Sequence, residues 1–263
     1  MSRYVVASCF TPILKTPHFR EVFGSTDGAS LPLDEQGLLR AVDMVAWPET
    51  GFEVAKELDG PILEVRMEEY PGEVFYLDKR FTSSSFEKPL KQKKILPPKE
   101  LLLERLFALV GTPYIWGGNY SPGIPELLLY YPPKKPISLE LELIWTLKGV
   151  DCSGLLYEVT EGYTPRNSSE LVHYGQALDI QGKTAKQLVE SLKPLDLIVW
   201  KGHVIIALTP TLCIESLRGR GVLIQELTSR LEEVQTVLHR APANLWDSSN
   251  CTDHSFVVRR WFS

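Results

Sequence analysis

Short apolar runs alternate with turn residues along the first third of the chain. Between Tyr4 and Phe81, the runs YVVASCF, LLRAVDMVAW, ILEVRM and EVFYLDKRF are separated by Gly, Pro and Asp residues. Short strands bounded by such residues give this pattern. The spacing predicts a small β-barrel over residues 1–85.

A polar, basic and proline-containing stretch follows the predicted barrel. Residues 82–98, TSSSFEKPLKQKKILPP, have no apolar periodicity, and this composition is typical of a connecting segment. We therefore place a linker at 86–98 and a second domain at 99–263.

The second domain begins with helical patterns and continues with strands. KELLLERLFALV, after Pro97 and Pro98, has helical spacing, and prolines are tolerated in a first helical turn. DCSGLLYEVTEGY predicts a second helix with Asp151 as N-cap, and SSELVHYGQAL a third helical piece. Turn-bounded, β-branched runs predict strands at 196–200, 203–208, 212–216 and 222–227. Helices followed by strands describe an α+β domain.

Composition narrows the class of protein. The 263 residues are 44% hydrophobic and 23% charged, which is ordinary for a globular protein of one large or two modest domains. The net charge of -5 and the lack of a long Lys/Arg tract argue against a nucleic-acid partner. No stretch reaches the roughly 18 to 20 apolar residues of a membrane-spanning helix, and LLLERLFALV is interrupted by Glu104 and Arg105, so we expect no membrane span. The N-terminus lacks a signal-peptide pattern, and we expect a cytoplasmic protein, with a periplasmic or secreted protein as the alternative.

The four cysteines stand singly in the sequence. Cys9, Cys152, Cys213 and Cys251 have neither the CxxC spacing of a zinc site nor the density of a disulfide scaffold. Cys9 and Cys213 lie in apolar strand runs and are expected to be buried filler, while Cys251 lies in a polar C-terminal loop. No histidine has metal-ligand spacing. We expect no metal and no cofactor.

Cys152 stands where a helix is predicted to begin, and a helix N-terminus favours a thiolate. A thiolate nucleophile needs a base, and His203 opens the apolar strand HVIIAL. Glu215 follows twelve positions later on the next predicted strand, so a hairpin would bring its carboxylate to the second imidazole N–H. Each residue also has a structural alternative: a small buried hydrophobe for the cysteine and a packed strand residue for the histidine.

Several linked motifs around these residues resemble the NlpC family of bacterial cell-wall cysteine peptidases. GTPYIWGG at 111–118 resembles the segment before the catalytic cysteine, VDCSGLLYEV at 150–159 the nucleophile helix, and TPRNSS at 164–169 the loop after it. LKPLDLIVW and GHVIIAL resemble the strand pair that delivers the histidine. The resemblance covers about 105–227. It implies a papain-like fold, in which the nucleophile helix packs on an antiparallel sheet.

The resemblance also implies catalytic roles. Cys152 corresponds to the nucleophile, His203 to the general base and Glu215 to the third residue, which orients the imidazole. The backbone N–H of Cys152 would help to bind the oxyanion formed on attack.

Four further residues are expected to bind substrate. Tyr114 corresponds to the family tyrosine that lines the active site, and Trp116 stands in the same segment. Asp151 and Ser153 correspond to residues that hold the free amino end of the peptide in the recycling branch of the family. Their alternative roles are an N-cap and a first-turn hydroxyl.

The N-terminal segment resembles, more loosely, the bacterial SH3-like domains that precede the catalytic domain in peptide-recycling members. Such a barrel covers one side of the cleft and admits short peptides with a free N-terminus. The resemblance implies a D,L-endopeptidase that hydrolyses the γ-D-glutamyl–diaminopimelate bond of peptidoglycan peptides through a thioester. We expect it to be a monomer. The alternatives are a muramoyl-L-alanine amidase, a thiol acyltransferase and a catalytically silent wall-binding protein.

The sequence departs from the family pattern in several places. The third catalytic position is most often histidine, whereas Glu215 is anionic. Residues 119–150 are much longer than the few residues usual between the WGG and DCSG motifs, which predicts an insertion with a loop and a short helix. It could be a lid, a docking surface or a plain surface insertion. Leu195 replaces a glycine usual before the Asp of the strand motif, and Leu171 stands where glutamine is common.

Overall fold

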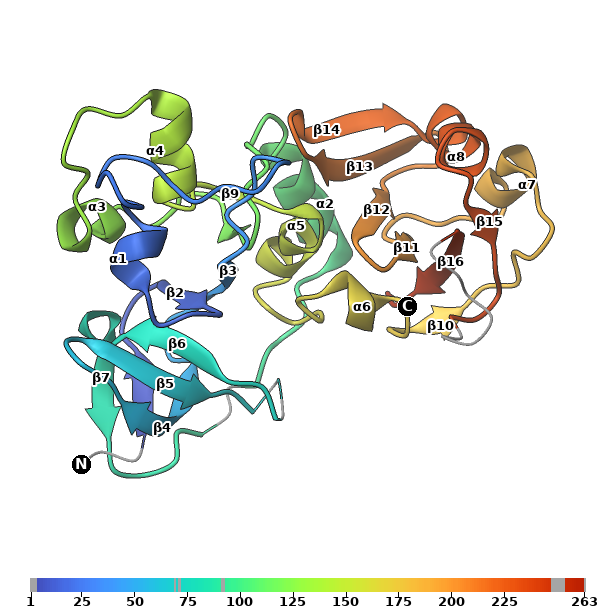
Figure 1. Cartoon of the computed structure of the whole chain (residues 1–263). Helices are drawn as coiled ribbons and strands as arrows, with labels where there is room; N and C mark the ends of the chain where they lie inside the picture. The colour runs from blue at the N-terminus through green and yellow to red at the C-terminus, as the bar shows by residue number, and fades with distance from the viewer. Residues whose placement is uncertain (1–3, 69, 71, 91–92, 247–253, 263) are drawn as a thin grey trace. The chain divides into compact units, whose positions relative to one another are not determined.

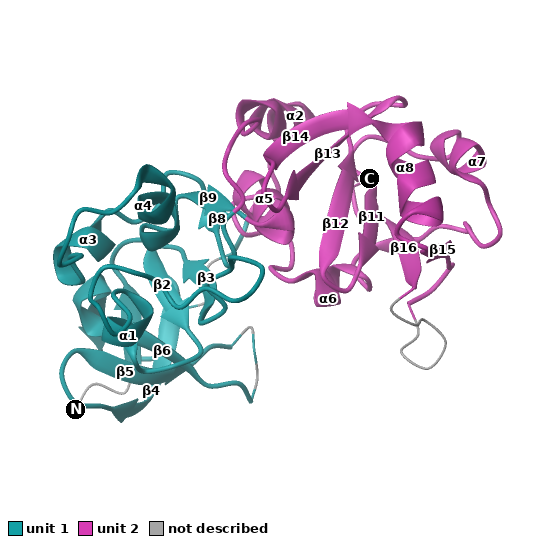
Figure 2. Cartoon of the chain, turned by 45° about the horizontal axis from the view of Figure 1, so that its top comes forward, with its two compact units in different colours: residues 1–94, 115–150 teal, residues 95–114, 151–263 magenta. Residues whose placement is uncertain are grey.

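The computed structural model describes residues 4–68, 70, 72–90, 93–246 and 254–262 (Figure 1). The chain divides into two compact units, one of residues 1–94 and 115–150, the other of residues 95–114 and 151–263 (Figure 2). Each unit combines helices with a β-sheet, so the mixed α and β composition is as the sequence predicts. No helix in the described ranges is long and apolar enough to cross a membrane.

The first unit is organised around a seven-stranded sheet. Its strand order is β3-β2-β6-β5-β4-β1-β7, with antiparallel neighbours throughout. The strands are β1 (Tyr4–Ala7), β2 (Thr11–Leu14), β3 (Val42–Ala46), β4 (Gly51–Glu57), β5 (Ile62–Arg66), β6 (Phe75–Asp78) and β7 (Thr82–Ser85), accompanied by α1 (Phe19–Val22) and the 3-10 helix η1 (Lys79–Phe81). The four apolar runs of the sequence therefore contain β1, β3, β5 and β6, whereas β2, β4 and β7 lie outside them. β7 ends where the predicted linker begins. The SH3-like identity of this sheet stays a prediction.

Residues 115–150 belong to the first unit. They form β8 (Asn119–Tyr120), α3 (Glu126–Tyr130), α4 (Leu139–Trp145) and β9 (Gly149–Val150). Trp145 is fully buried, and its ring lies 6.5 Å from that of Phe23. Tyr131 packs 5.7 Å from the rings of both Phe19 and Phe23. The segment that we expected as an insertion of the second domain instead shares a hydrophobic core with the N-terminal residues, because its large aromatic side chains are buried there.

One buried carboxylate also joins the two sequence segments of the first unit. Asp78 at the end of β6 is fully buried and forms an ion pair with Arg80, whose Nε donates to Oδ2 at 2.9 Å. The hydroxyl of Tyr131 donates to the same oxygen at 2.6 Å. The Arg80 guanidinium lies 4.2 Å from the centre of the Tyr130 ring. A buried charge is tolerated only when it is paired and hydrogen-bonded, so Asp78 requires residues from both segments.

The second unit is built on a sheet of order β10-β16-β11-β12-β13-β14, antiparallel along this path. Its strands are β10 (Gln176–Ala177), β11 (Leu197–Trp200), β12 (His203–Ala207), β13 (Leu212–Leu217), β14 (Gly221–Glu226), β15 (Ala241–Pro242) and β16 (Ser255–Arg260), with β15 pairing parallel to β16. Its helices are α2 (Lys99–Ala108), α5 (Cys152–Val159), α6 (Ser168–Leu171), α7 (Ala185–Val189) and α8 (Leu227–Thr236). Helix α5 contacts both α2 and the strands β12 and β13.

Some parts of the second unit were not predicted. The four expected strands are present, but β16 lies between β10 and β11 although it comes from the far end of the sequence. The third helical piece is only α6, and the sequence after it contributes β10. Leu195 has a backbone φ of 74°, the left-handed region that favours glycine, which accounts for the glycine usual at this position.

Replacing Tyr131 by Phe should lower the free energy of unfolding by about 1 to 2 kcal/mol, because the buried Asp78 loses a hydrogen-bond donor. Urea denaturation of the two proteins would measure the change. Tyr130→Phe is the matched control, since it keeps the ring over Arg80 and should alter stability by less than about 0.5 kcal/mol. Equal stabilities of Tyr131→Phe and wild type would contradict the role given to this hydrogen bond.

Candidate active site

Helix α5 begins at Cys152, as the sequence predicts. Its N-cap is Asp151, whose carboxylate accepts a hydrogen bond of 2.7 Å from the backbone N–H of Gly154. The Cys152 side chain is buried, and its Sγ lies 3.8 Å from the carbonyl oxygen of Gly202. The first turn of a helix presents N–H groups and a positive dipole end, which favour a thiolate at this position.

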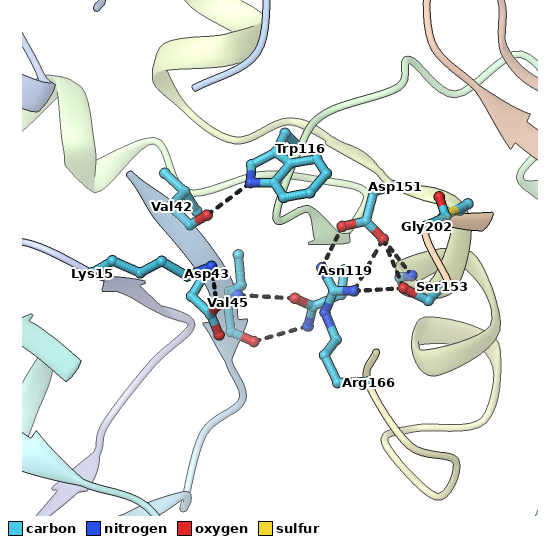
Figure 3. Close-up of polar contacts among 12 residues, drawn as sticks. Lys15, Val42, Asp43, Val45, Trp116, Asn119, Asp151, Ser153, Arg166 and Gly202 are labelled. Atoms are coloured by element: carbon cyan, nitrogen blue, oxygen red, sulfur yellow. Dashed lines mark hydrogen bonds and ion pairs between the residues drawn. The ribbon is translucent and has the colours of Figure 1, made fainter. Parts of the chain in front are cut away.

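A buried arginine holds the cap of this helix. Nη1 and Nη2 of Arg166 donate to the two carboxylate oxygens of Asp151 at 3.0 and 2.6 Å (Figure 3). Nη1 also donates to the hydroxyl of Ser153 at 3.0 Å. Two-point contact between a guanidinium and a carboxylate fixes the orientation of both groups. Both predicted flanking residues therefore contact Arg166, and their binding of a substrate amine stays a prediction.

The structure brings His203 and Glu215 together. His203 is the first residue of β12, Glu215 lies in β13, and the two strands pair as the predicted antiparallel hairpin. The imidazole Nε2 lies 2.6 Å from Oε2 of Glu215. Glu215 is fully buried, whereas 12% of the His203 side chain is exposed. This hydrogen bond leaves the other ring nitrogen, Nδ1, as the one available to Cys152.

Glu215 is surrounded by further donors. Arg230 of α8 donates from Nε to Oε1 at 2.6 Å and from Nη2 to Oε2 at 2.9 Å. The side-chain amide of Gln225 donates to Oε1 at 2.6 Å. Burial alone would raise the pKa of Glu215, but the hydrogen bonds from His203 and Arg230 hold this pKa below its ordinary value. The carboxylate is therefore ionised at neutral pH.

The charge on His203 follows from the same contacts. Burial disfavours the imidazolium, but hydrogen bonds and charge interactions with Cys152 and Glu215 outweigh it and raise the pKa of His203 to about 9. The Trp200 ring lies 5.0 Å from the imidazole, centre to centre. The imidazole of His203 can therefore hold a proton at neutral pH and deliver it to a nearby leaving group.

The loop after the nucleophile helix contacts both halves of this site. Arg166 binds the helix cap, and two residues later the hydroxyl of Ser168 accepts a hydrogen bond of 2.9 Å from the backbone N–H of Gly202. Gly202 has a φ of 103°, a conformation that L side chains rarely adopt. The PRNSS sequence therefore places the helix start and the turn before His203 in one hydrogen-bonded arrangement.

The two aromatic residues predicted to bind substrate lie in different units. Tyr114 belongs to the second unit, where the preceding Thr112 accepts a 2.8 Å hydrogen bond from the N–H of Val222 on β14. Trp116 belongs to the first unit, and its indole N–H donates to the carbonyl oxygen of Val42 on β3 at 3.0 Å (Figure 3). Their contact with substrate stays a prediction.

The side chain of Asn119 holds the WGGN sequence against β3. Its side-chain carbonyl accepts from the N–H of Val45 at 2.9 Å, and its amide donates to the Val45 carbonyl at 2.8 Å (Figure 3). The side chain thus pairs with one residue of β3, the last strand in the order of its sheet, as a neighbouring strand would. Gly117, with φ of 74°, lies so close to Val42 that a Cβ would meet its side chain at 2.6 Å.

Sequence reasoning missed Arg166 and Arg230. Arg166 stands inside the TPRNSS motif, so a buried partner for the N-cap Asp151 could have been sought there. Arg230 follows the last predicted strand, and no local pattern indicates that it contacts Glu215. Cys213 is buried in β13, as predicted, while Cys251 lies outside the described residues.

No protein-family model matches the sequence, and no curated protein matches it. Among solved structures, the chain is similar to an NlpC/p60 family protein from Bacillus cereus, with 18% identity over 99% of this chain and 63% of that chain and a TM-score of 0.37. It is also similar to NlpC1 from Trichomonas vaginalis, with 12% identity, 98% and 69% coverage and a TM-score of 0.36. RipD from Mycobacterium tuberculosis, described as a non-catalytic NlpC/p60 domain protein adapted to peptidoglycan binding, gives 20% identity, 52% and 89% coverage and a TM-score of 0.34.

These neighbours are NlpC/p60 proteins. The chain spans 63% of the length of the Bacillus cereus protein.

Replacing Glu215 by Gln should lower the pH at which His203 loses its proton by at least about one unit, because the imidazolium loses its anionic partner. NMR titration of the histidine ring nitrogens would measure the change from the wild-type value of about 9. Glu232→Gln, which removes an exposed carboxylate from α8, is the control and should leave the titration unchanged. An unchanged titration in Glu215→Gln would contradict the coupling.

Proposed function

We propose that this chain is a cysteine peptidase of the NlpC type, with Cys152 as nucleophile, His203 as proton carrier and Glu215 as the residue that orients the imidazole. The observation that carries the proposal is the 2.6 Å hydrogen bond between His203 and the buried Glu215. It holds an imidazole with a pKa of about 9 beside a cysteine at a helix start. A thiol, an imidazole base and a third group that orients the imidazole are the arrangement used in nucleophilic catalysis by cysteine.

The first half of the reaction forms a thioester. The Cys152 thiolate attacks the carbonyl carbon of the scissile amide, and the carbonyl electrons move to oxygen. N–H groups at the first turn of α5, including that of Cys152, stabilise the resulting oxyanion. As the tetrahedral intermediate collapses, the imidazolium of His203 gives its proton to the leaving amine, which departs as the C–N bond breaks.

The second half regenerates the enzyme. The neutral imidazole of His203 removes a proton from water, and the hydroxide oxygen attacks the thioester carbonyl. Collapse of this second intermediate breaks the C–S bond and releases a carboxylate product and the Cys152 thiolate. Glu215 keeps Nε2 engaged throughout, so the ring keeps the orientation in which Nδ1 serves the cysteine.

We further propose that the amide is the γ-D-glutamyl–diaminopimelate bond of peptidoglycan peptides. The support is the resemblance of the linked GTPYIWGG, DCSG, TPRNSS and GHVIIAL motifs to the NlpC family. The same resemblance supports Tyr114, Trp116, Asp151 and Ser153 as residues near the substrate. An amidase or acyltransferase using the same Cys152 and His203 would give different products, and a wall-binding protein would give none.

Replacing Cys152 by Ala should abolish hydrolysis, because the acyl acceptor is removed, while the thermal unfolding curve stays nearly unchanged. The measurement is mass spectrometry of protein incubated with L-alanyl-γ-D-glutamyl-diaminopimelate. Cys9→Ala, which removes a half-buried thiol from the first unit, should keep wild-type turnover. Hydrolysis by Cys152→Ala would contradict the assignment of the nucleophile.

Product masses from three substrates test the proposed bond. We expect wild-type protein to release free diaminopimelate from the unblocked tripeptide and to leave an N-acetylated copy and intact peptidoglycan uncut. Digestion of the blocked peptide or of the wall would indicate an endopeptidase with an open groove, and not an enzyme limited to short peptides with a free N-terminus. Different product ends would indicate an amidase or acyltransferase, and the absence of any product would favour a binding protein.

A further inference from the structure

The two carboxylate oxygens of Glu215 accept four hydrogen bonds. Oε1 accepts from Nε of Arg230 and from Gln225, both at 2.6 Å. Oε2 lies 2.6 Å from His203 Nε2 and 2.9 Å from Arg230 Nη2. Arg230 is 5% exposed and comes from α8, whereas the other contacts come from strands of the sheet. One buried anion is thus shared between a histidine and an arginine.

We propose that Arg230 is a positioning residue of the active site, which acts on His203 through Glu215. The inference rests on the proposed function only in that it calls this cluster an active site, since the contacts of Arg230 and Glu215 are present in the structure without a substrate. A guanidinium that reaches both oxygens fixes the plane of the carboxylate. Oε2 is thereby held toward the imidazole rather than free to rotate away.

Arg230 also supplies charge. Glu215 is fully buried, and an unpaired buried carboxylate would be strongly disfavoured. With Arg230 present the carboxylate remains ionised, but its charge is divided between two cations. The imidazolium is therefore held less firmly than by a carboxylate without a second partner, which allows His203 to release its proton to a leaving group within the reaction.

Other charged or titratable groups around this cluster are few among the described residues. Cys152 on α5 faces the imidazole, and Cys213 on β13 interacts with both Glu215 and Arg230. Glu226 interacts electrostatically with Cys213, and Glu233 lies 2.8 Å from Nη1 of Arg230. Glu233 is half-exposed, so it offers only a solvent-screened alternative to Glu215.

Two substitutions of Arg230 separate its geometry from its charge. Arg230→Met removes the charge and the donors, whereas Arg230→Lys keeps the charge but cannot reach both oxygens as a fork. Both are read by NMR of the full chain labelled with ¹⁵N-histidine. The observables are the titration of the His203 ring and the exchange rate of its Nε2 proton with water. Neither observable needs turnover.

Arg230→Met should raise the pH at which His203 loses its proton by about one unit, because Glu215 then serves the imidazolium alone. This shift is opposite in sign to that of Glu215→Gln. Arg230→Lys should leave the titration within about half a unit of wild type, since a cation remains, but should speed exchange of the Nε2 proton several-fold, because the carboxylate is less firmly oriented.

Two control variants test for unrelated effects. Glu233→Gln removes the other carboxylate that contacts Arg230 and should change neither observable. Arg259→Met removes an equally buried arginine, whose Nε donates to the Val172 carbonyl, and should change stability without moving the His203 titration.

An unchanged titration in a folded Arg230→Met would overturn the proposal and leave Arg230 with a purely structural role. If Arg230→Met does not fold, Arg230→Lys decides alone: faster Nε2 exchange supports the positioning role, and wild-type exchange overturns it. If the wild-type protein does not hydrolyse the peptide proposed above while these NMR results hold, the proposed substrate is wrong and the role of Arg230 stands.

Discussion

The second unit depends on the burial of one negative charge. Glu215 has no exposed side-chain surface, and its carboxylate is accommodated only because four donor contacts surround it. Those contacts come from β12, β14 and α8, so the position of three elements is determined by the need to satisfy one group on β13. Displacing any of them would leave an ion or a donor unpaired in the interior, which costs several kcal/mol. The geometry around His203 is therefore rigid for a thermodynamic reason.

The start of the nucleophile helix is also fixed by a buried ion pair. Asp151 caps α5, and Arg166 binds the cap with a second ion pair that is nearly excluded from water. Two residues after Arg166, Ser168 binds the turn that precedes His203. A single short loop therefore links the cysteine and histidine sides of the site. This arrangement explains why arginine and serine occur two residues apart in that loop, where each makes a separate contact.

Local patterns predicted a large part of this arrangement. The N-cap at Asp151, the helix beginning at Cys152 and the hairpin that pairs His203 with Glu215 all depend on spacing within fewer than about twenty residues. The identity of the partner of Glu215 does not, because Arg230 reaches it only after the chain has turned from β14 into α8. Likewise, β16 enters the sheet beside β11 from the end of the sequence.

The sequence does not reveal that residues 115–150 belong to the first unit, for a related reason. The aromatic residues Tyr131 and Trp145 indicate that the segment has a core, but not whose core it shares. That depends on complementary groups far earlier in the sequence: Asp78 lies 53 residues before Tyr131, and Phe23 lies more than a hundred residues before Trp145. At Leu195 the unpredicted feature is local instead of distant. The backbone there is left-handed, but a leucine gives no sign of this conformation in the sequence.

The two units are interleaved in the sequence, and this has a consequence for biosynthesis. The chain leaves the first unit after residue 94, contributes 95–114 to the second, and returns for 115–150 before completing the second unit. Neither unit is encoded by one uninterrupted stretch. As the polypeptide emerges from a ribosome, the first unit cannot close until Val150 has been added, and α2 must wait for the strands that follow. Cutting the chain once, near residue 94, would leave the first product without residues 115–150 and would leave that segment on the second product without the core that it shares.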